Sequence, residues 1–236
     1  MPQAKASLAR GDRPHRAMAP LPAIEAGRQE AHVPLLACRA TPQERRSVML
    51  ADSLVPRAVA SSTHAITIHA PPERVWQWVA QMGAGRAGWY SYDCIDNGGR
   101  PSAEEILPEF QRIAPEDILP ATPGREDVFR VAAVEPPRRL VLTVPESREG
   151  TQVSWEFLLL PLEGGDTRLI VRGRISKTWP SPTRTVPGPA HHPILIERVY
   201  SVLARAPAAL MLPVAGFGHY IMEARMLRGI RRRAEA

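Results

Sequence analysis

Two ionisable residues, His219 and Glu223, lie one helical turn apart near the end of the chain. When residues 218–234 are placed at steps of about 100° around a helix, both residues fall within the apolar arc. An unpaired charge is costly to bury, so this position needs an explanation. One is general acid/base catalysis, in which the carboxylate orients the imidazole and tunes its pKa toward neutrality. The other is structural, with Glu223 neutralised by a buried arginine or capping the glycine-rich segment 83–88.

A second group of candidates, Trp89, Tyr90, Tyr92 and Asp93, follows the glycine-rich segment. As part of a short helix over residues 89–97, they can gate a cavity or stack on an aromatic ligand. They can also supply a phenol and a carboxylate for enolate chemistry, such as aldol cyclisation and dehydration. The alternative is an aromatic plug that closes the core. The candidate catalytic residues from the two groups are Tyr90, Asp93, His219 and Glu223.

Metal and phosphate-loop chemistry has little support in the sequence. Cys38 and Cys94 are far apart, and no cysteine or histidine spacing matches a zinc site or a disulfide framework. The GAGRAG run follows a helix rather than a strand, so it does not fit a phosphate loop. We therefore expect no metal site and no cofactor.

The net charge of +6 and the pI near 10.0 do not by themselves indicate nucleic-acid binding. The arginines gather at the two ends of the chain, without interleaved aromatic residues or a known binding motif, so we interpret them as solvated. The apolar stretch 206–217 is interrupted by proline and glycine and is shorter than the roughly 20 residues that span a bilayer. A cytoplasmic protein without nucleic-acid partners is expected, since no signal sequence precedes the domain.

The elements that position these residues follow from the spacing of apolar side chains. Residues 1–40 are rich in Pro, Ala, Arg and Gly, so we expect them to form a disordered extension. We expect residues 41–62 to form a lead-in segment and residues 63–236 to form one domain. Within the domain, period-two alternation predicts strands, and a repeat of three to four residues predicts helices. The predicted strands are 64–70, 127–134, 139–144, 151–162 and 167–175, and the predicted helices are 73–82 and 218–234.

Strand alternation assigns one face of the sheet to the interior. The predicted inward residues include Phe129, Val131, Ala133, Leu140, Leu142, Trp155, Phe157, Leu159, Leu169 and Val171. Arg168, Arg172 and Arg174 take the opposite face, where we expect them to be solvated. The residues Glu163, Gly164, Gly165 and Asp166 predict a hairpin. The expected sheet is therefore antiparallel, with one wet face.

Several blocks of the sequence resemble one known superfamily. The run ITIHAPPERVWQWVAQMGAGRAGWYSYD resembles the opening of bacterial SRPBCC, or START-like, proteins of the polyketide cyclase-dehydrase-like kind. The runs ILPEFQ, FRVAAVEPPRRLVL and GHYIMEARMLRGIRRRAE resemble their later blocks, so the resemblance covers residues 41–235. It implies an α+β helix-grip fold, shared with Bet v 1-like carriers, in which a curved antiparallel sheet wraps a long C-terminal helix around an internal cavity.

The resemblance also implies which residues line that cavity. They are Trp89, Tyr92, Val131, Leu140, Leu142, Trp155, Phe157, Tyr220 and Leu227. A largely apolar pocket of this kind indicates a protein that binds a small hydrophobic molecule, such as a polyketide, lipid or aromatic metabolite. One alternative is a cofactor-independent cyclase or dehydratase that uses the same cavity for general acid/base catalysis. The other is an interaction module for a protein or a membrane surface, because one fold hosts many functions.

Overall fold

The chain folds around one six-stranded antiparallel sheet with the strand order β1-β6-β5-β4-β3-β2. The computed structural model describes residues 38–122, 128–144, 150–177 and 208–236, and for residues 208–217 it describes the backbone only. The helices are α1 (Pro42–Arg46), α2 (Leu50–Leu54), α3 (Pro72–Ala80), α4 (Asp93–Asp96) and α6 (Ala208–Glu235), with short 3-10 turns at Pro108–Phe110 and Glu163–Gly165. The strands are β1 (Ala58–Ile68), β2 (Ile118–Pro120), β3 (Val128–Glu135), β4 (Arg139–Thr143), β5 (Val153–Pro161) and β6 (Thr167–Ser176).

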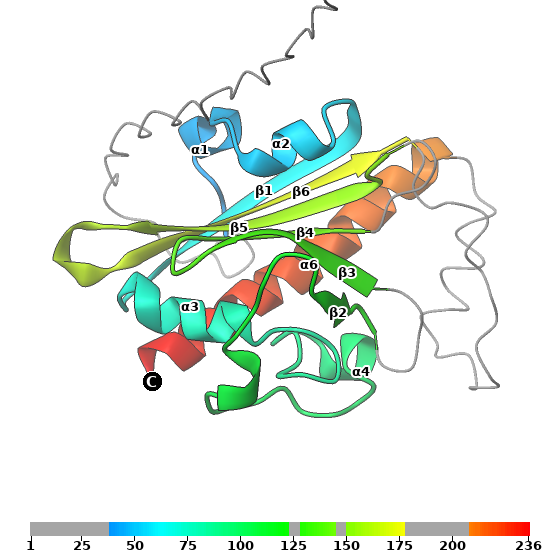
Figure 1. Ribbon diagram of the computed structural model, residues 1–236. Helices are drawn as coiled ribbons and strands as arrows, with labels where there is room; N and C mark the ends of the chain where they lie inside the picture. Colours follow the sequence, from blue (N-terminus) through cyan, green and yellow to red (C-terminus); the bar gives the residue numbers. More distant parts are fainter. Residues whose placement is uncertain (1–37, 123–127, 145–149, 178–207) are drawn as a thin grey trace, which may run out of the picture.

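The long helix α6 crosses one face of the sheet, and α1 and α2 lie on the other face (Figure 1). This is the predicted α+β helix-grip arrangement, with a curved antiparallel sheet around the C-terminal helix. The predicted hairpin is confirmed between β5 and β6, where Gly164 and Gly165 have φ values of +84° and +87°. Glycine suits this turn because other residues rarely adopt positive φ.

The core lies between the sheet and α6, on the face that strand alternation predicts. It is one continuous cluster in which side chains from β3, β4, β5 and β6 meet α3 and α6. Its fully buried members from the sheet include Val131, Leu140, Leu142, Phe157, Leu159, Leu169 and Val171, and those from α6 include Leu227, Ile230 and Ala234. Apolar burial on this scale is the main stabilising term of the fold.

The prediction for Ala133 is wrong because β3 contains a bulge. The pairing of β3 with β4 shifts between Val131 and Ala133, so one extra residue interrupts the alternation. After the bulge, Val134 rather than Ala133 packs against the core and pairs with Leu140. A one-residue shift exchanges the two faces of a strand, which is why the sequence pattern misassigned this position.

The predicted wet face of the sheet is covered by α1 and α2, so the arginines on it are not solvated. Arg172 is only 3% exposed and makes five hydrogen bonds, to the Thr63 hydroxyl, the Asp52 carboxylate and three carbonyl groups around the end of α1. These bonds use all five guanidinium donors. Arg168 pairs with the buried Glu44 and Arg174 with Asp52. The lead-in segment is therefore an integral layer of the domain.

Some element boundaries also differ from the predicted ones. Helix α6 begins at Ala208, ten residues before the predicted start, and the predicted helix 89–97 is reduced to Asp93–Asp96. Cys38 and Ala40 are buried, so packing already begins inside the predicted extension, whose residues 1–37 lie outside the described part of the chain. Among the described helices, none is long and apolar enough to cross a membrane.

Candidate functional site

An aromatic cluster lies where β3 and β5 meet the segment that follows α3. Trp155 is its centre, with ring centroids 4.8 Å from Phe157 and 5.6 Å from both Trp89 and Phe129. Trp89 and Phe157 are buried, whereas Trp155 and Phe129 are only partly buried. Large apolar rings that remain partly accessible next to a core form a surface on which an apolar ligand can pack.

The two tryptophans of this cluster are held in place by their indole N–H groups. Trp89 donates from Nε1 to the carbonyl oxygen of Ala121 at 3.0 Å. Trp155 donates from Nε1 to Glu223 Oε1 at 3.2 Å. Because the polar edge of each ring is already bonded, the ring faces are the parts left for other contacts.

Glu223 is a fully buried carboxylate that joins the sheet to α6. Its Oε2 atom lies 2.5 Å from His64 Nδ1 on β1 and 3.3 Å from His219 Nε2, one turn earlier on α6. Oε1 accepts the bond from Trp155. Within the described part of the chain, the partners of Glu223 are two histidines and a tryptophan, so neither the predicted arginine partner nor the predicted cap on residues 83–88 is found there.

The histidine contacts keep Glu223 ionised in spite of its burial. Burial alone raises the pKa of a carboxyl group, but the hydrogen bonds and charges of His219 and His64 lower the pKa of Glu223 to about 2. For His219, burial acts to lower the pKa, and the hydrogen bond and charge of Glu223 outweigh it, so the pKa of His219 is raised. The two groups therefore favour an imidazolium–carboxylate pair.

His219 has one ring nitrogen available at the edge of the aromatic cluster. Its side chain is 47% exposed, and its ring lies 6.3 Å from that of Trp155. Nε2 faces Glu223, and within the described part of the chain no partner contacts Nδ1. In the imidazolium form Nδ1 carries a proton, so a hydrogen-bond donor stands beside the aromatic surface.

The structure places Tyr90 and Asp93 on the other side of α6 from His219, so the four candidate catalytic residues are not brought together. Tyr90 is 3% exposed, and its hydroxyl donates to the Trp78 carbonyl and accepts from Gln81 Nε2. Burial raises its pKa well above the usual value. Asp93 accepts two hydrogen bonds, from the Ser102 backbone N–H and the Ser102 hydroxyl. Both groups are thus engaged in holding the loop.

The other residues predicted to line the cavity lie either in the buried core or away from the aromatic cluster. Tyr92 lies away from the aromatic cluster, beneath the guanidinium of Arg225 at 5.2 Å. Tyr220 packs against His64 in a tilted arrangement, with ring centroids 4.9 Å apart. Val131, Leu140, Leu142 and Leu227 are fully buried in the core cluster, as is Phe157 of the aromatic cluster. Among the described residues, no group of His, Cys, Asp and Glu could hold a metal ion.

Sequence reasoning missed His64 and Phe129 as members of this site. A signal for His64 was present, because it has the same strand parity as Ile66 and Ile68, both of which are buried. Phe129 was assigned to the inner face but not to the site, since nothing in a single strand indicates that its ring meets Trp89. That contact depends on the loop 83–88, which turns the chain back toward the sheet through a bridge between Gly83 and Gly88.

The fold and this site define a helix-grip protein with an aromatic cluster beside a buried histidine–glutamate pair. No family model matches the chain, and no curated protein matches it. Solved structures do match. CalU16 from Micromonospora echinospora is 16% identical, with 74% of this chain and 83% of that chain covered and a TM-score of 0.31.

Two further matches have similar values. A polyketide cyclase-like protein from Corynebacterium glutamicum is 18% identical over 72% of this chain and 91% of its own, with a TM-score of 0.36. Protein Ms6760 from Mycobacterium smegmatis is 12% identical over 77% of this chain and 91% of its own, with a TM-score of 0.39. Identities and TM-scores this low transfer neither a ligand nor a reaction.

Proposed function

We propose that the protein binds a small, planar hydrophobic molecule against the aromatic cluster of Trp89, Phe129, Trp155 and Phe157. The observation that carries this proposal is the partial exposure of Trp155 and Phe129 next to His219, whose Nδ1 has no partner among the described residues. Each ring contact of a ligand with such a cluster contributes about 0.5–1.5 kcal/mol beyond simple burial. A ligand that covers two rings therefore gains about 1–3 kcal/mol in addition to the burial of its own apolar surface.

His219 suggests that the ligand also carries an acceptor oxygen. A carbonyl or phenolate oxygen over Trp155 can accept from Nδ1, while Glu223 holds the imidazolium form from the other side. Bonds from a charged donor contribute about 1.5–3 kcal/mol. The expected ligand class is therefore aromatic ketones, quinones or phenols rather than plain hydrocarbons or aliphatic lipids.

The test begins with native mass spectrometry of the purified protein and extraction of any small molecule that co-purifies. Tryptophan fluorescence titration then compares 2-acetylnaphthalene, which has an acceptor oxygen, with 2-ethylnaphthalene, which has none. We expect Trp155→Ala to weaken both probes by about tenfold. His219→Gln is expected to weaken only the ketone. Trp78→Phe is the control, because Trp78 packs against Tyr90 outside the cluster.

Two results would count against this proposal. One is a protein that carries no ligand and binds neither naphthalene probe. The other is that Trp155→Ala and His219→Gln bind the naphthalene probes as tightly as Trp78→Phe does.

A second candidate function is a cyclase or dehydratase, favoured by the pairing of His219 with a buried carboxylate. In this reaction the neutral imidazole takes a proton from the carbon next to a bound carbonyl, and the imidazolium returns it to oxygen or carbon. Tyr90 and Asp93 do not enter it, because their polar groups hold the loop on the other side of α6. Hydrogen–deuterium exchange at the methyl group of bound 2-acetylnaphthalene tests it. Exchange that is faster than in buffer without protein, and that His219→Gln abolishes, supports catalysis. Exchange at the rate measured in buffer without protein supports binding alone.

A further inference from the structure

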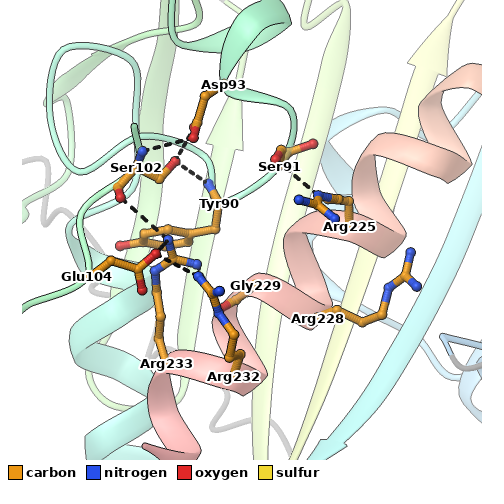
Figure 2. A pocket seen from close by; sticks show the side chains of 10 residues that line it. All are labelled: Tyr90, Ser91, Asp93, Ser102, Glu104, Arg225, Arg228, Gly229, Arg232 and Arg233. Carbon is orange, nitrogen blue, oxygen red and sulfur yellow. Dashed lines mark hydrogen bonds and ion pairs between the residues drawn. The ribbon is translucent and has the colours of Figure 1, made fainter. Parts of the chain in front are cut away.

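A polar groove of about 390 Å³ lies on the opposite side of α6 from the aromatic cluster. Its walls are the C-terminal half of α6 and the segment from Tyr90 to Glu104 (Figure 2). Four of its ten lining residues are arginines, namely Arg225, Arg228, Arg232 and Arg233, and two are acids, Asp93 and Glu104. Two positive charges in the groove are thus left without a compensating carboxylate.

Both acids already have partners within the groove. Glu104 Oε1 is shared between Arg232 at 2.6 Å and Arg233 at 2.8 Å. Asp93 accepts the backbone N–H and the hydroxyl of Ser102 at 3.0 Å and 2.5 Å. Among the described residues, neither acid forms an ion pair with Arg225 or Arg228.

Arg225 and Arg228 keep most of their donors unused. Arg225 bonds only through Nε, to the Ser91 carbonyl at 3.4 Å, and Arg228 only through Nε, to the Ala224 carbonyl at 3.0 Å. Within the described chain, their terminal amino groups have no hydrogen-bond partner, although the Arg225 guanidinium lies over the Tyr92 ring. At spacing i, i+3 the two side chains are neighbours on the helix, so they repel each other until an anion lies between them. Guanidinium groups of this kind bind oxyanions through paired N–H donors.

The wall behind these arginines is rigid. Arg233 is only 7% exposed, lies 4.6 Å over the Tyr90 ring and donates to the Ala103 carbonyl at 2.7 Å. Tyr90 has a φ of +57°, uncommon for a residue with a side chain, and the Ser102 hydroxyl accepts its N–H. A side chain at Gly229 would collide with the Tyr90 carbonyl, so α6 and the loop are in direct backbone contact. A preformed groove loses little conformational entropy when it binds a ligand.

We propose that this groove binds the phosphate group of a soluble small molecule, with Arg225 and Arg228 as its main ligands. The two uncompensated charges match a phosphate dianion. The groove is also larger than a single phosphate needs, so the rest of the molecule has room beside it. This site is separate from the aromatic cluster and does not depend on the function proposed for it.

Isothermal titration calorimetry of the full chain with inorganic phosphate and pyrophosphate, at constant ionic strength, tests the proposal. The test variant is Arg225→Gln/Arg228→Gln, and the charge-matched control is Arg46→Gln/Arg231→Gln, whose residues lie outside the groove. Loss of a charged hydrogen-bonding partner is expected to weaken binding by about 10- to 100-fold in the test variant. The control is expected to bind within about twofold of the wild type.

Three outcomes would overturn the proposal. The first is no binding of phosphate or pyrophosphate by the wild type. The second is equal weakening in both double variants, which indicates unspecific charge attraction. The third is binding to vesicles of anionic phospholipid but not to soluble phosphates, which assigns the arginines to a membrane surface. If the double variant does not fold, the single variants Arg225→Gln and Arg228→Gln replace it, each with about tenfold weakening expected. Trp155→Ala should leave phosphate binding unchanged, so this test is independent of the aromatic site.

Discussion

Replacing Glu223 by glutamine removes the charge that links β1, α6 and Trp155, with little change in shape. The wild-type carboxylate is fully buried and contacts His64, His219 and the Trp155 indole. The amide keeps the volume but cannot balance an imidazolium. We therefore expect a marked loss of stability whose size depends on pH.

The magnitude follows from the pKa of Glu223, which is about 2 in the folded protein against 4.5 for the free group. At about 1.36 kcal/mol per pKa unit, the interactions of the ionised carboxylate contribute about 3 kcal/mol to stability near neutral pH. Because the folded pKa is lowered, this contribution is complete above pH 4.5 and is lost as the pH falls toward 2.

The pKa of His219 sets the highest pH at which this ion pair contributes fully to stability. It is raised above 6.5 in the folded protein, so its contribution is complete below pH 6.5 and is lost as the pH rises through the folded value. His219 and Glu223 report the same interaction, so the two contributions are not added. The difference in stability between wild type and Glu223→Gln is therefore largest between pH 4.5 and pH 6.5.

Urea denaturation at pH values from 3 to 9 measures this difference. We expect the free energy of unfolding of Glu223→Gln to lie about 3 kcal/mol below the wild type at pH 5.5, and this deficit to shrink to about 1 kcal/mol at pH 3. The matched control is Glu109→Gln, which removes an exposed carboxylate. If Glu223→Gln is as stable as Glu109→Gln at pH 5.5, or if its deficit does not change with pH, the buried ion-pair interpretation is refuted.

Two further predictions concern packing. Arg172→Met leaves the carbonyls at the end of α1 without their donor and is expected to cost about 3 kcal/mol or more in urea denaturation, whereas Arg46→Met, at an exposed position, costs little. Equal stability of the two variants would contradict this. Gly229→Ala is expected to lose about 1–3 kcal/mol through collision with Tyr90, while Gly218→Ala, on the same helix with nothing within 4 Å, is neutral or stabilised by up to about 1 kcal/mol. A neutral Gly229→Ala would mean that α6 can move away from the loop.

The inner face of the sheet could be predicted because successive side chains of a strand point to opposite faces. Alternation in β5 placed Phe157 and Leu159 inside, and the glycine pair at the hairpin fixed where the chain reverses. The helical arc of α6 likewise placed Glu223 on the buried face. In these elements the side chains on one face all have the same environment, so spacing alone identifies them.

The outer face could not be predicted in the same way. Outward arginines on a strand are typical of a solvated face, and α1 and α2 have only five residues each, too few to display a helical period. Their attachment combines a small apolar cluster, in which Met49 packs with Leu158 and Ile170, with buried polar contacts such as Glu44 with Arg168 and the Ala51 N–H with Glu156. Contacts of this kind appear only when segments distant in sequence are placed together.

The division of the candidate residues between two sites has its origin in α6 itself. His219 and Glu223 face the sheet, whereas Arg225, Arg228 and Arg232 line the polar groove, so one helix forms a wall of both sites. Tyr90 and Trp89 are adjacent in sequence but have their side chains on different sides: Trp89 joins the aromatic cluster, and Tyr90 packs beneath Arg233. The positive φ of Tyr90 marks the point where the chain turns between them. The direct contact at Gly229 holds this loop against α6, so the same packing of helix and loop positions the residues of both sites.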